Sequence, residues 1–490
     1  MDRATPSPES PAPRDPATQS GPDPHPRSPQ AAPGRPDLIV ATTFVQTIRH
    51  FFPDLNDWLQ ALPDSRDRDL IIYETRFLGW TGLFLFLMQL GSRRQLDFAF
   101  ERGSEATLAN LNRLAGTRQD SLPVHDTLDH FLEHVPWLAF HALRLLMVQR
   151  LIRMKALDDA RLLGHAVVAV DGTGLFSFRE RHCDACLERK HKSGTRYHHQ
   201  VLEAKLLGPA GVVVSIGTEF IENADASLSR DPEQFKQDCE LKAFGRLAPQ
   251  LKADFPQLRI VLAGDALFVC GAVLQIAKDN EWSYVLTFKE GRLPSVWGEF
   301  QRLKELCPEN VRDIQLPDGT RQVFRWVHDL SYEDDQKRRW TFQALDCTET
   351  SPTGQVHYFA WITDLVVTKT NAAPIAEKGG RARWKIENEA FNRQKNHGPN
   401  LEHVYSTDPE KWKAYYYLLQ LAFLITQLVE RGSLLRQLTA ELHRTPLQLF
   451  GGLANIVRRL REILRWLHWP DDCFDAETAR RRRIGFTNTS

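Results

Sequence analysis

Val167-Val168-Ala169-Val170-Asp171 is a short, mostly β-branched apolar run that ends in a carboxylate. Such a run is typical of a buried strand, which places Asp171 at the strand's C-terminal end. Arg259–Ala263 is a second run of this kind, and Asp265 follows just past its end. Because strand ends are rigid, two such strands can hold their carboxylates at a fixed separation.

The surrounding segments alternate between strand and helix patterns. A Gly208–Gly211 turn separates two further strand-like runs. The resulting order of strand, strand, strand, helix, strand, helix, strand predicts an α/β domain with a mixed sheet over residues 161–309. Besides the two runs above, the predicted strands are Val201–Leu207, Val212–Phe220 and Tyr284–Phe288, and the predicted helices are Pro232–Leu251 and Val269–Lys278.

Residues 310–370 have a different pattern, with strand-like runs separated by turn clusters, and we interpret them as a β-rich insertion. Residues 371–405 then complete the core, with a predicted helix over 381–397 that carries Glu387. The runs in the insertion are Arg321–Val327, Trp340–Leu345 and Val356–Ile362.

Both ends of the chain differ from this core. Residues 1–36 hold 11 of the 28 prolines, and we predict that this segment is disordered because it cannot bury enough apolar surface. Residues 37–160 show helical spacing and predict an N-terminal helical domain. Residues 406–490 predict C-terminal helices followed by a basic tail, Arg480–Arg483.

Composition narrows the class of protein. The 490 residues include 62 basic and 62 acidic side chains, which excludes a protein coated in positive charge but not a locally basic face. Seven scattered cysteines favour a reducing compartment, and no signal peptide is evident, so we expect a cytoplasmic protein. The apolar runs Phe77–Leu90 and Tyr415–Val429 fall short of the roughly 20 residues of a spanning helix, so we expect both to be buried core helices.

Asp171, Asp265 and Glu387 could together hold divalent metal ions. Mg²⁺ prefers oxygen ligands, and two such ions can activate a nucleophile and stabilise a leaving oxygen in phosphoryl transfer. The plainer interpretation is that each aspartate is a helix cap or turn residue, and Asp171-Gly172-Thr173-Gly174 would suit a turn.

Three segments resemble the acidic blocks of DDE transposases from cut-and-paste insertion sequences: Val170–Thr173, Ala263–Phe268 and Arg383–Asn388. The resemblance runs from about residue 70 to 430, and it is to the branch whose RNase H-like core carries a β-strand insertion. It implies an RNase H-like mixed-sheet catalytic core with a β-rich insertion, preceded by a helical domain and followed by C-terminal helices.

The resemblance also implies a function. Asp171, Asp265 and Glu387 would be catalytic and would bind two Mg²⁺ ions, for which Mn²⁺ can substitute. The enzyme would bind transposon ends, with the help of the 37–160 domain, nick DNA and join the 3′-hydroxyl to target DNA. A homodimer is implied because two ends must be brought together, and a nucleoid-associated place in a bacterial cytoplasm follows from the family.

The family signature runs Tyr, two residues, Arg, three residues, Glu, six residues, Lys. Arg383 and Glu387 fit it, whereas Gly380 stands at the Tyr position and Gln394 at the Lys position, with Lys395 next to it. Arg383 and Lys395 could hold a DNA phosphate, and Trp384 could stack on an unpaired base. The plainer interpretations are solvated helix charges and a tryptophan that packs the helix onto the sheet.

A second cluster lies after the first strand, in His182-Cys183-Asp184-Ala185-Cys186 and the histidines that follow it. Cys183, Cys186, His191 and His198 could form a structural Zn²⁺ site, and the alternative is a polar loop with free thiols. Basic residues near this loop, and two that follow the predicted Tyr284–Phe288 strand, could contact DNA phosphates. They are Lys190, Lys192, Arg196 and Lys205 near the loop, and Lys289 and Arg292 after the strand.

Two other functions remain open from the sequence. One is an RNase H-like DNA nuclease that cuts without joining. The other is a catalytically inactive, DNA-binding relic of a transposase, which the absent signature Tyr and displaced Lys would favour and the intact acidic residues oppose.

Overall fold

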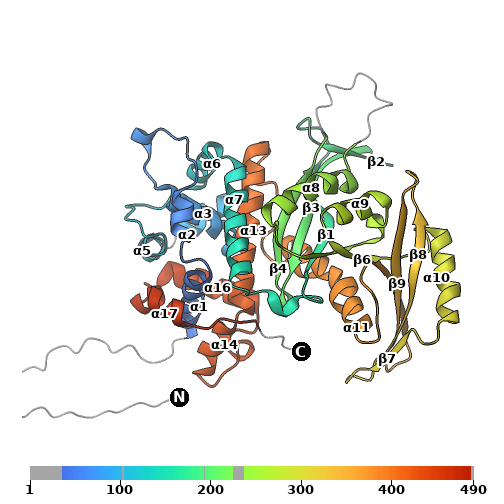
Figure 1. Cartoon of the computed structure of the whole chain (residues 1–490). Coiled ribbons are helices and arrows are strands. Elements are labelled where there is room, and N and C mark those ends of the chain that lie inside the picture. Colours follow the sequence, from blue (N-terminus) through green and yellow to red (C-terminus); the bar gives the residue numbers. More distant parts are fainter. Residues whose placement is uncertain (1–35, 102–103, 193, 224–236, 487–490) are drawn as a thin grey trace, which may run out of the picture. The chain divides into compact units, whose positions relative to one another are not determined.

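The computed structural model of the chain describes residues 36–101, 104–192, 194–223 and 237–486 (Figure 1). The predicted disordered segment 1–36 lies outside the described residues, apart from Pro36, which begins the first helix. In the described part, helices accompany a single mixed sheet, so the predicted α/β class is confirmed.

The sheet has ten strands in the order β2-β3-β1-β5-β6-β10-β9-β8-β7, with β4 paired to β3. The central strand β1 runs antiparallel to β3 and parallel to β5, and β5 runs parallel to β6. The strands in chain order are β1 (Ala166–Phe178), β2 (Leu187–His191), β3 (Gly194–Leu207), β4 (Val213–Ile221), β5 (Ile260–Gly264), β6 (Ser283–Thr287), β7 (Val311–Gln315), β8 (Arg321–Glu333), β9 (Arg339–Thr350) and β10 (Val356–Thr363).

Burial on both faces explains why the first half of β1 is apolar throughout. Val168 and Val170 belong to the larger hydrophobic cluster, whereas Val167 and Ala169 belong to a second cluster on the opposite face. Successive side chains of a strand point to opposite faces, so a strand covered on both sides needs apolar residues at every position. The same alternation places Asp171 on the face of the second cluster.

The β-rich segment 310–370 does form strands, and they extend the central sheet. β10 pairs antiparallel with β6, with Trp361 opposite Thr287, and β9, β8 and β7 follow outward. Helix α10 (Pro294–Leu306) packs on β8. The insertion therefore widens the sheet of the core, and it places β10 directly beside β6.

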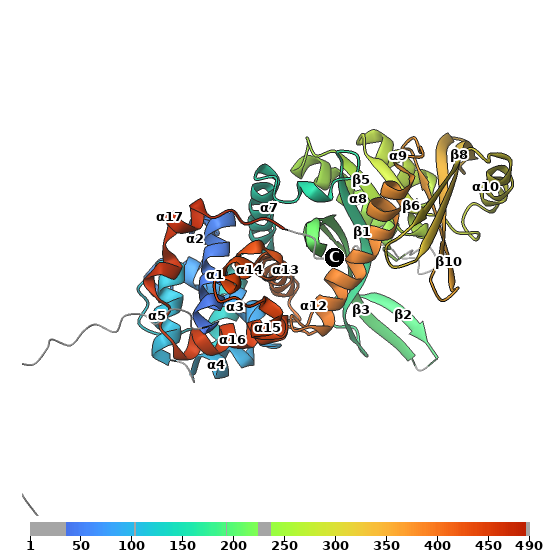
Figure 2. The same ribbon diagram turned by 90° about the horizontal axis from the view of Figure 1, so that it is seen from below.

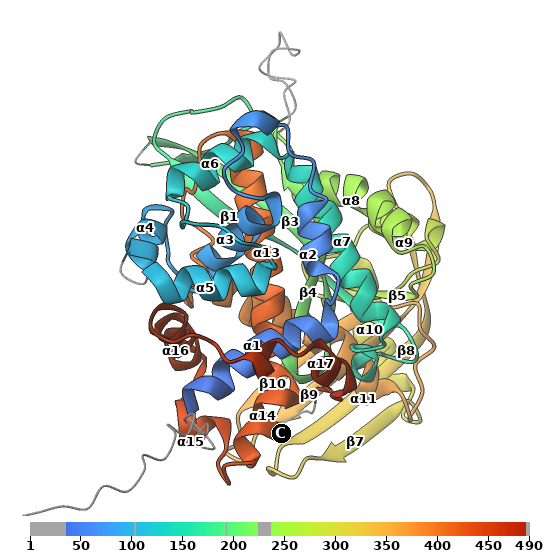
Figure 3. The ribbon, with the colours of Figure 1, turned by 90° about the vertical axis from the view of Figure 1, so that its left-hand side faces the viewer.

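Helices of the two chain ends pack together (Figure 3). α1 contacts α14, α16 and α17, and α13 contacts α3 and α7. The Asn110 side chain donates to the Leu467 carbonyl at 2.7 Å and accepts from the Trp469 amide at 2.8 Å. The helices are α1 (Pro36–Phe51), α2 (Leu55–Gln60), α3 (Thr75–Leu87), α4 (Arg94–Glu101), α5 (Ser104–Ala115), α6 (His125–His134), α7 (Trp137–Arg153), α13 (Pro409–Arg431), α14 (Ser433–Ala440), α15 (Pro446–Phe450), α16 (Leu453–Trp466) and α17 (Ala476–Arg481).

Three further helical segments cover the sheet (Figure 2). α8 (Glu240–Asp254) packs on β3 and β4, and α9 (Gly271–Asp279) packs on β6. The predicted helix 232–251 therefore begins later, at Glu240, and its residues 232–236 lie outside the described ones. The third segment, 372–396, crosses the face of the second cluster and contacts β1, β5 and β6.

Segment 372–396 is helical, as predicted for 381–397, but its geometry is irregular. Short α-helices, α11 (Ala372–Pro374) and α12 (Asn392–Asn396), stand at its ends. Between them come a π-helix at Ile375–Gly380, a 3₁₀ turn at Arg381–Arg383 and a second π-helix at Ile386–Phe391. Such irregular helices often mark functional sites, because they change which side chains face the same way.

Among the described residues, one helical stretch, Pro409–Ala440, is long and apolar enough to span a membrane, and 78% of its apolar window is buried inside the fold. Tyr415 and Val429 are both buried, and Phe77–Met88 is buried throughout. Both apolar runs are therefore core helices, as predicted.

A buried ion pair connects the sheet to α13. Lys205 Nζ lies 2.9 Å from Glu203 Oε2, both side chains are fully buried, and Lys205 also donates to Gln420 of α13 at 3.1 Å. Tyr416 of α13 donates to Glu203 at 2.7 Å. Lys205 is thus a structural residue and not the phosphate contact that its sequence position suggested.

We predict that Lys205→Met lowers the free energy of unfolding by about 3–5 kcal/mol, because it leaves the Glu203 carboxylate buried without its cation. Denaturant unfolding of the full chain measures this. Lys337→Met is the matched control: Lys337 also pairs with a glutamate, but it is 85% exposed, so we expect a change below about 0.5 kcal/mol. Equal stability of the two variants would contradict the prediction.

Candidate active site

Asp171 lies in the middle of a long strand, not at a strand end as predicted. β5 pairs with β1 only from Ala166 to Ala169, whereas β3 continues opposite Asp171, Gly172, Thr173 and beyond. The interpretation of Asp171–Gly174 as a turn is therefore wrong, because this ladder with β3 keeps the segment extended. Asp171 stands just past the point where β5 leaves β1, with its side chain 17% exposed.

Asp265 follows β5 directly, as predicted. It caps the 3₁₀ turn Ala266–Phe268, and its Oδ1 accepts from the Leu267 amide at 2.8 Å. Arg292 steadies this turn by donating to the carbonyls of Leu267 and Val269, both at 3.0 Å. Arg292 is thereby engaged with backbone. Asp265 is a cap residue and also lines the cleft described below.

Arg383 joins the first and third carboxylates. Its Nη1 donates to Asp171 Oδ2 at 3.1 Å and to Glu387 Oε1 at 2.7 Å. The Arg383 side chain is 13% exposed and that of Glu387 is 51% exposed. The segment 372–396 thus delivers a cation and a carboxylate to Asp171, and the two lie on one side of the segment as the spacing predicted.

A fourth carboxylate, Glu240, belongs to the same group and was not predicted. Glu240 is the first residue of α8, and a Cβ added at Gly172 would collide with its carboxyl group. Gly172 points to the face opposite Asp171, so Glu240 reaches β1 from the other side of the sheet. Burial raises the pKa of Glu240, and the nearby charge of Asp265 raises it further.

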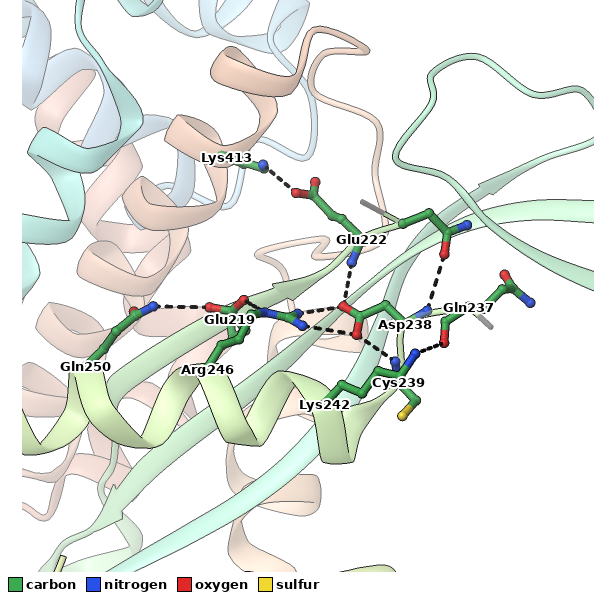
Figure 4. A network of polar contacts seen from close by, with 10 residues as sticks. Glu219, Glu222, Gln237, Asp238, Cys239, Lys242, Arg246, Gln250 and Lys413 are labelled. Carbon is green, nitrogen blue, oxygen red and sulfur yellow. Dashed lines mark hydrogen bonds and ion pairs between the residues drawn. The ribbon is translucent and has the colours of Figure 1, made fainter. Parts of the chain in front are cut away.

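Polar contacts hold the start of α8 in place (Figure 4). Arg246 donates to Asp238 at 2.6 and 3.1 Å and to Glu219 of β4 at 2.5 Å. Asp238 also accepts from the Glu222 amide at 3.3 Å, and Lys413 of α13 pairs with Glu222 at 2.8 Å. Asp238 lies two residues before Glu240, so this network connects the α8 N-terminus to the end of β4 and to α13.

The site carries an excess of negative charge. Burial raises the pKa of Asp171 to about 7; the charge of Arg383 lowers it, and those of Glu387, Glu240 and Asp265 raise it. Arg383 contacts two of these four carboxylates, Asp171 and Glu387. Oxygen ligands in such a group are the set that Mg²⁺ or Mn²⁺ prefers, so the residues present fit a hard divalent cation.

Two of these carboxylates, Asp265 and Glu387, line a cleft of about 640 Å³ with an aromatic wall. Phe359 and Trp361 of β10 stack in parallel, with ring centroids 6.1 Å apart. Trp384 also lines the cleft and is 57% exposed, so it does not pack the helix onto the sheet. The cleft combines aromatic faces and charge; its charged lining residues are Asp265, Lys289, Glu290, Arg381, Arg383 and Glu387.

Two departures from the signature have structural reasons. A side chain at Gly380 would collide with the Trp361 indole, so the fold admits no tyrosine there without movement of Trp361. Gln394 is fully buried and donates to Gln420 at 2.9 Å. Lys395 pairs with Glu402 at 2.7 Å and is not among the residues that line the cleft.

The Cys/His cluster forms a group of its own. His182, Cys183, Cys186 and His199 bring together four metal-ligating side chains. His191 and His198, which the sequence spacing had suggested, are not in that group. All seven cysteines are free.

No family model matches the chain, and no curated protein matches it. The function is therefore inferred from the residues of the site and their geometry.

The raised pKa of Asp171 predicts a pH effect on the metal-free protein. The unfolded side chain titrates near pH 3.9. Between about pH 4 and 7 the folded chain keeps a proton that the unfolded chain has released, so rising pH lowers stability through this group. Asp171→Asn cannot ionise, and in EDTA at pH 8 we expect it to be more stable than wild type by about 1–3 kcal/mol.

Denaturant unfolding of both proteins between pH 5 and 8 measures the difference. The advantage of the asparagine variant should shrink towards pH 5. Parallel stability curves for wild type and variant would show that Asp171 has an ordinary pKa.

Proposed function

We propose that this protein is a transposase that cuts DNA and joins strands by metal-dependent phosphoryl transfer. The observation that carries the proposal is that Arg383 joins Asp171 of β1 to Glu387 of segment 372–396, while Glu387 and Asp265, at the end of β5, line one aromatic cleft. The charge of Asp265 also acts on Asp171. The strand order β4-β3-β1-β5-β6, three antiparallel strands followed by two parallel ones, supports an RNase H-like core.

Asp171, Asp265 and Glu387 would hold the catalytic Mg²⁺ ions. Bound there, two such ions supply Lewis acidity for the attacking and leaving oxygens of an in-line displacement. Because the pKa of Asp171 is about 7 in the metal-free state, the fraction that is protonated near neutral pH would release its proton on metal binding. Arg383, which donates to Asp171 and Glu387, would hold these two carboxylates in position.

DNA would enter along the cleft. The guanidinium of Arg383 lines it and can donate to a phosphate oxygen, and Lys289 offers a second cation. The exposed face of Trp384 can stack on an unpaired base beside the scissile phosphate. Lys395 is less suited to bind a phosphate in the cleft, because it pairs with Glu402 and does not line the cleft. The substrates would be transposon ends and target DNA, and two copies of the chain would hold two ends.

We predict that Asp171→Asn, Asp265→Asn and Glu387→Gln each reduce cleavage and strand transfer by about 10³-fold or more, because each removes a metal-ligand charge. DNA binding should stay equal or tighten, since a negative charge near phosphates is lost. Mg²⁺ should raise the unfolding midpoint of wild type more than that of any variant. Asp313→Asn is the control and should behave as wild type, because Asp313 forms an exposed ion pair with Arg321 on β7 and β8.

The assay joins an oligonucleotide with a free 3′-hydroxyl, taken from DNA that flanks the coding sequence, to a supercoiled plasmid with Mg²⁺ or Mn²⁺. Full activity in any of the three variants would overturn the site assignment. Metal-dependent cutting without joined product would favour a nuclease, and binding without cutting by wild type would favour an inactive relic.

We also predict that Trp384→Ala weakens binding of single-stranded DNA by about 10-fold, because one base–aromatic stack contributes about 1–3 kcal/mol. Fluorescence anisotropy with a labelled oligonucleotide measures this. Trp466→Ala is the matched control, since Trp466 is 65% exposed on α16 and does not line the cleft. An equal loss in both variants would mean that Trp384 has no special place in DNA binding.

A further inference from the structure

A compact group of thiols and imidazoles lies beyond the C-terminal half of β1. The Sγ atoms of Cys183 and Cys186 are 3.4 Å apart, and His199 Nε2 lies 3.5 and 3.6 Å from them. His182 Nε2 lies 3.3 Å from His199 Nε2. One ligand atom from each of the four residues lies within 4.8 Å of all the others.

These separations match the edges of a tetrahedral zinc site. With Zn–S bonds of about 2.3 Å and Zn–N bonds of about 2.0–2.1 Å, ligand atoms stand about 3.3–3.8 Å apart. The separations between sulfur and His199 and between the two imidazoles agree with this geometry, and the two sulfurs lie closer together than the edge of about 3.8 Å that two Zn–S bonds define. Two thiols and two imidazoles are a ligand set that suits zinc better than Mg²⁺.

The surroundings indicate a closed, structural site. Cys186 and His199 are almost fully buried. Aromatic rings enclose the imidazoles: Phe178 lies 4.2 Å from His182, and Phe176 and Trp412 lie 5.1 and 5.2 Å from His199, between ring centroids. The protein supplies all four ligands, which leaves no coordination position open for a substrate. This is the arrangement of structural zinc sites.

Strand geometry explains why these histidines and not their neighbours are brought together. His198 and His199 are consecutive on β3, so their side chains point to opposite faces, and only His199 faces the thiols. His191 ends β2 opposite Gly194 at the exposed tip of the hairpin. Spacing along the chain cannot distinguish His198 from His199, but the pleat can.

We propose that His182, Cys183, Cys186 and His199 bind one structural Zn²⁺ ion. The ion would fasten the loop after β1 to β3. Asn223, at the end of β4, donates to the Cys186 carbonyl at 2.9 Å, so the loop also joins the network that leads to α8. The site is separate from the carboxylates, and the proposal does not depend on the proposed function.

The test measures metal in the full chain purified without chelator, by elemental analysis. Wild type should hold about one zinc ion per chain, and Cys186→Ser and His199→Gln should lose it. The matched controls should keep the zinc ion: His198→Gln removes the neighbouring imidazole, His191→Gln removes an imidazole at the hairpin tip, and Cys239→Ser removes an exposed free thiol. Co²⁺ exchanged into wild type should give a thiolate-to-metal charge-transfer band, which ions at the carboxylates cannot produce.

A thiol-modifying mercurial added to folded wild type should release one zinc ion for every two site thiols that it modifies. This measurement tests the site even if Cys186→Ser does not fold. Wild type that holds no zinc and shows no thiolate band with Co²⁺ would overturn the proposal. Loss of zinc from His198→Gln as large as from His199→Gln would overturn the ligand assignment.

Discussion

The unequal lengths of the two strands beside β1 set the position of every group in the site. β3 pairs with β1 through Gly174 and, past a register shift, as far as Phe178, whereas β5 pairs only through Ala169. Asp171 therefore lies on a strand held straight by one neighbour, at the level where the other neighbour has ended. Segment 372–396 meets the strand there, and Arg383 contacts Asp171. If β5 were longer, it would pair with β1 at the level of Asp171 as well, so this edge of β1 would be covered by a strand.

Charge rather than packing is the unusual feature of this region. Arg383 is the cation that contacts Asp171 and Glu387, and Glu240 and Asp265 add to the negative potential. Burial, which removes the Asp171 carboxylate from water, is the largest cause of its raised pKa of about 7, and the neighbouring negative charges raise that pKa further. The metal-free fold consequently holds a destabilised carboxylate, and a bound divalent cation would relieve that cost.

Rigid supports surround this charged region. The Glu203–Lys205 pair and Tyr416 join β3 to α13, and the Asp238–Arg246 network fixes the α8 N-terminus. The two chain ends pack around α13 as one helical assembly, although the sequence suggests two separate helical regions.

Local sequence pattern was enough to predict the strands at 167–170 and 259–263, the mixed α/β class and the strands of 310–370, because burial dictates residue type at each position. It also predicted that Asp265 directly follows its strand, but its placement of Asp171 at a strand end was wrong. It could not predict that Glu240 lies over Gly172, that Trp361 fills the space at Gly380, or that His199 rather than His198 joins the two cysteines. These contacts depend on which face a side chain takes and on which distant segment covers it. Strand register and the packing of segment 372–396 decide both, and neither leaves a signal in neighbouring residues.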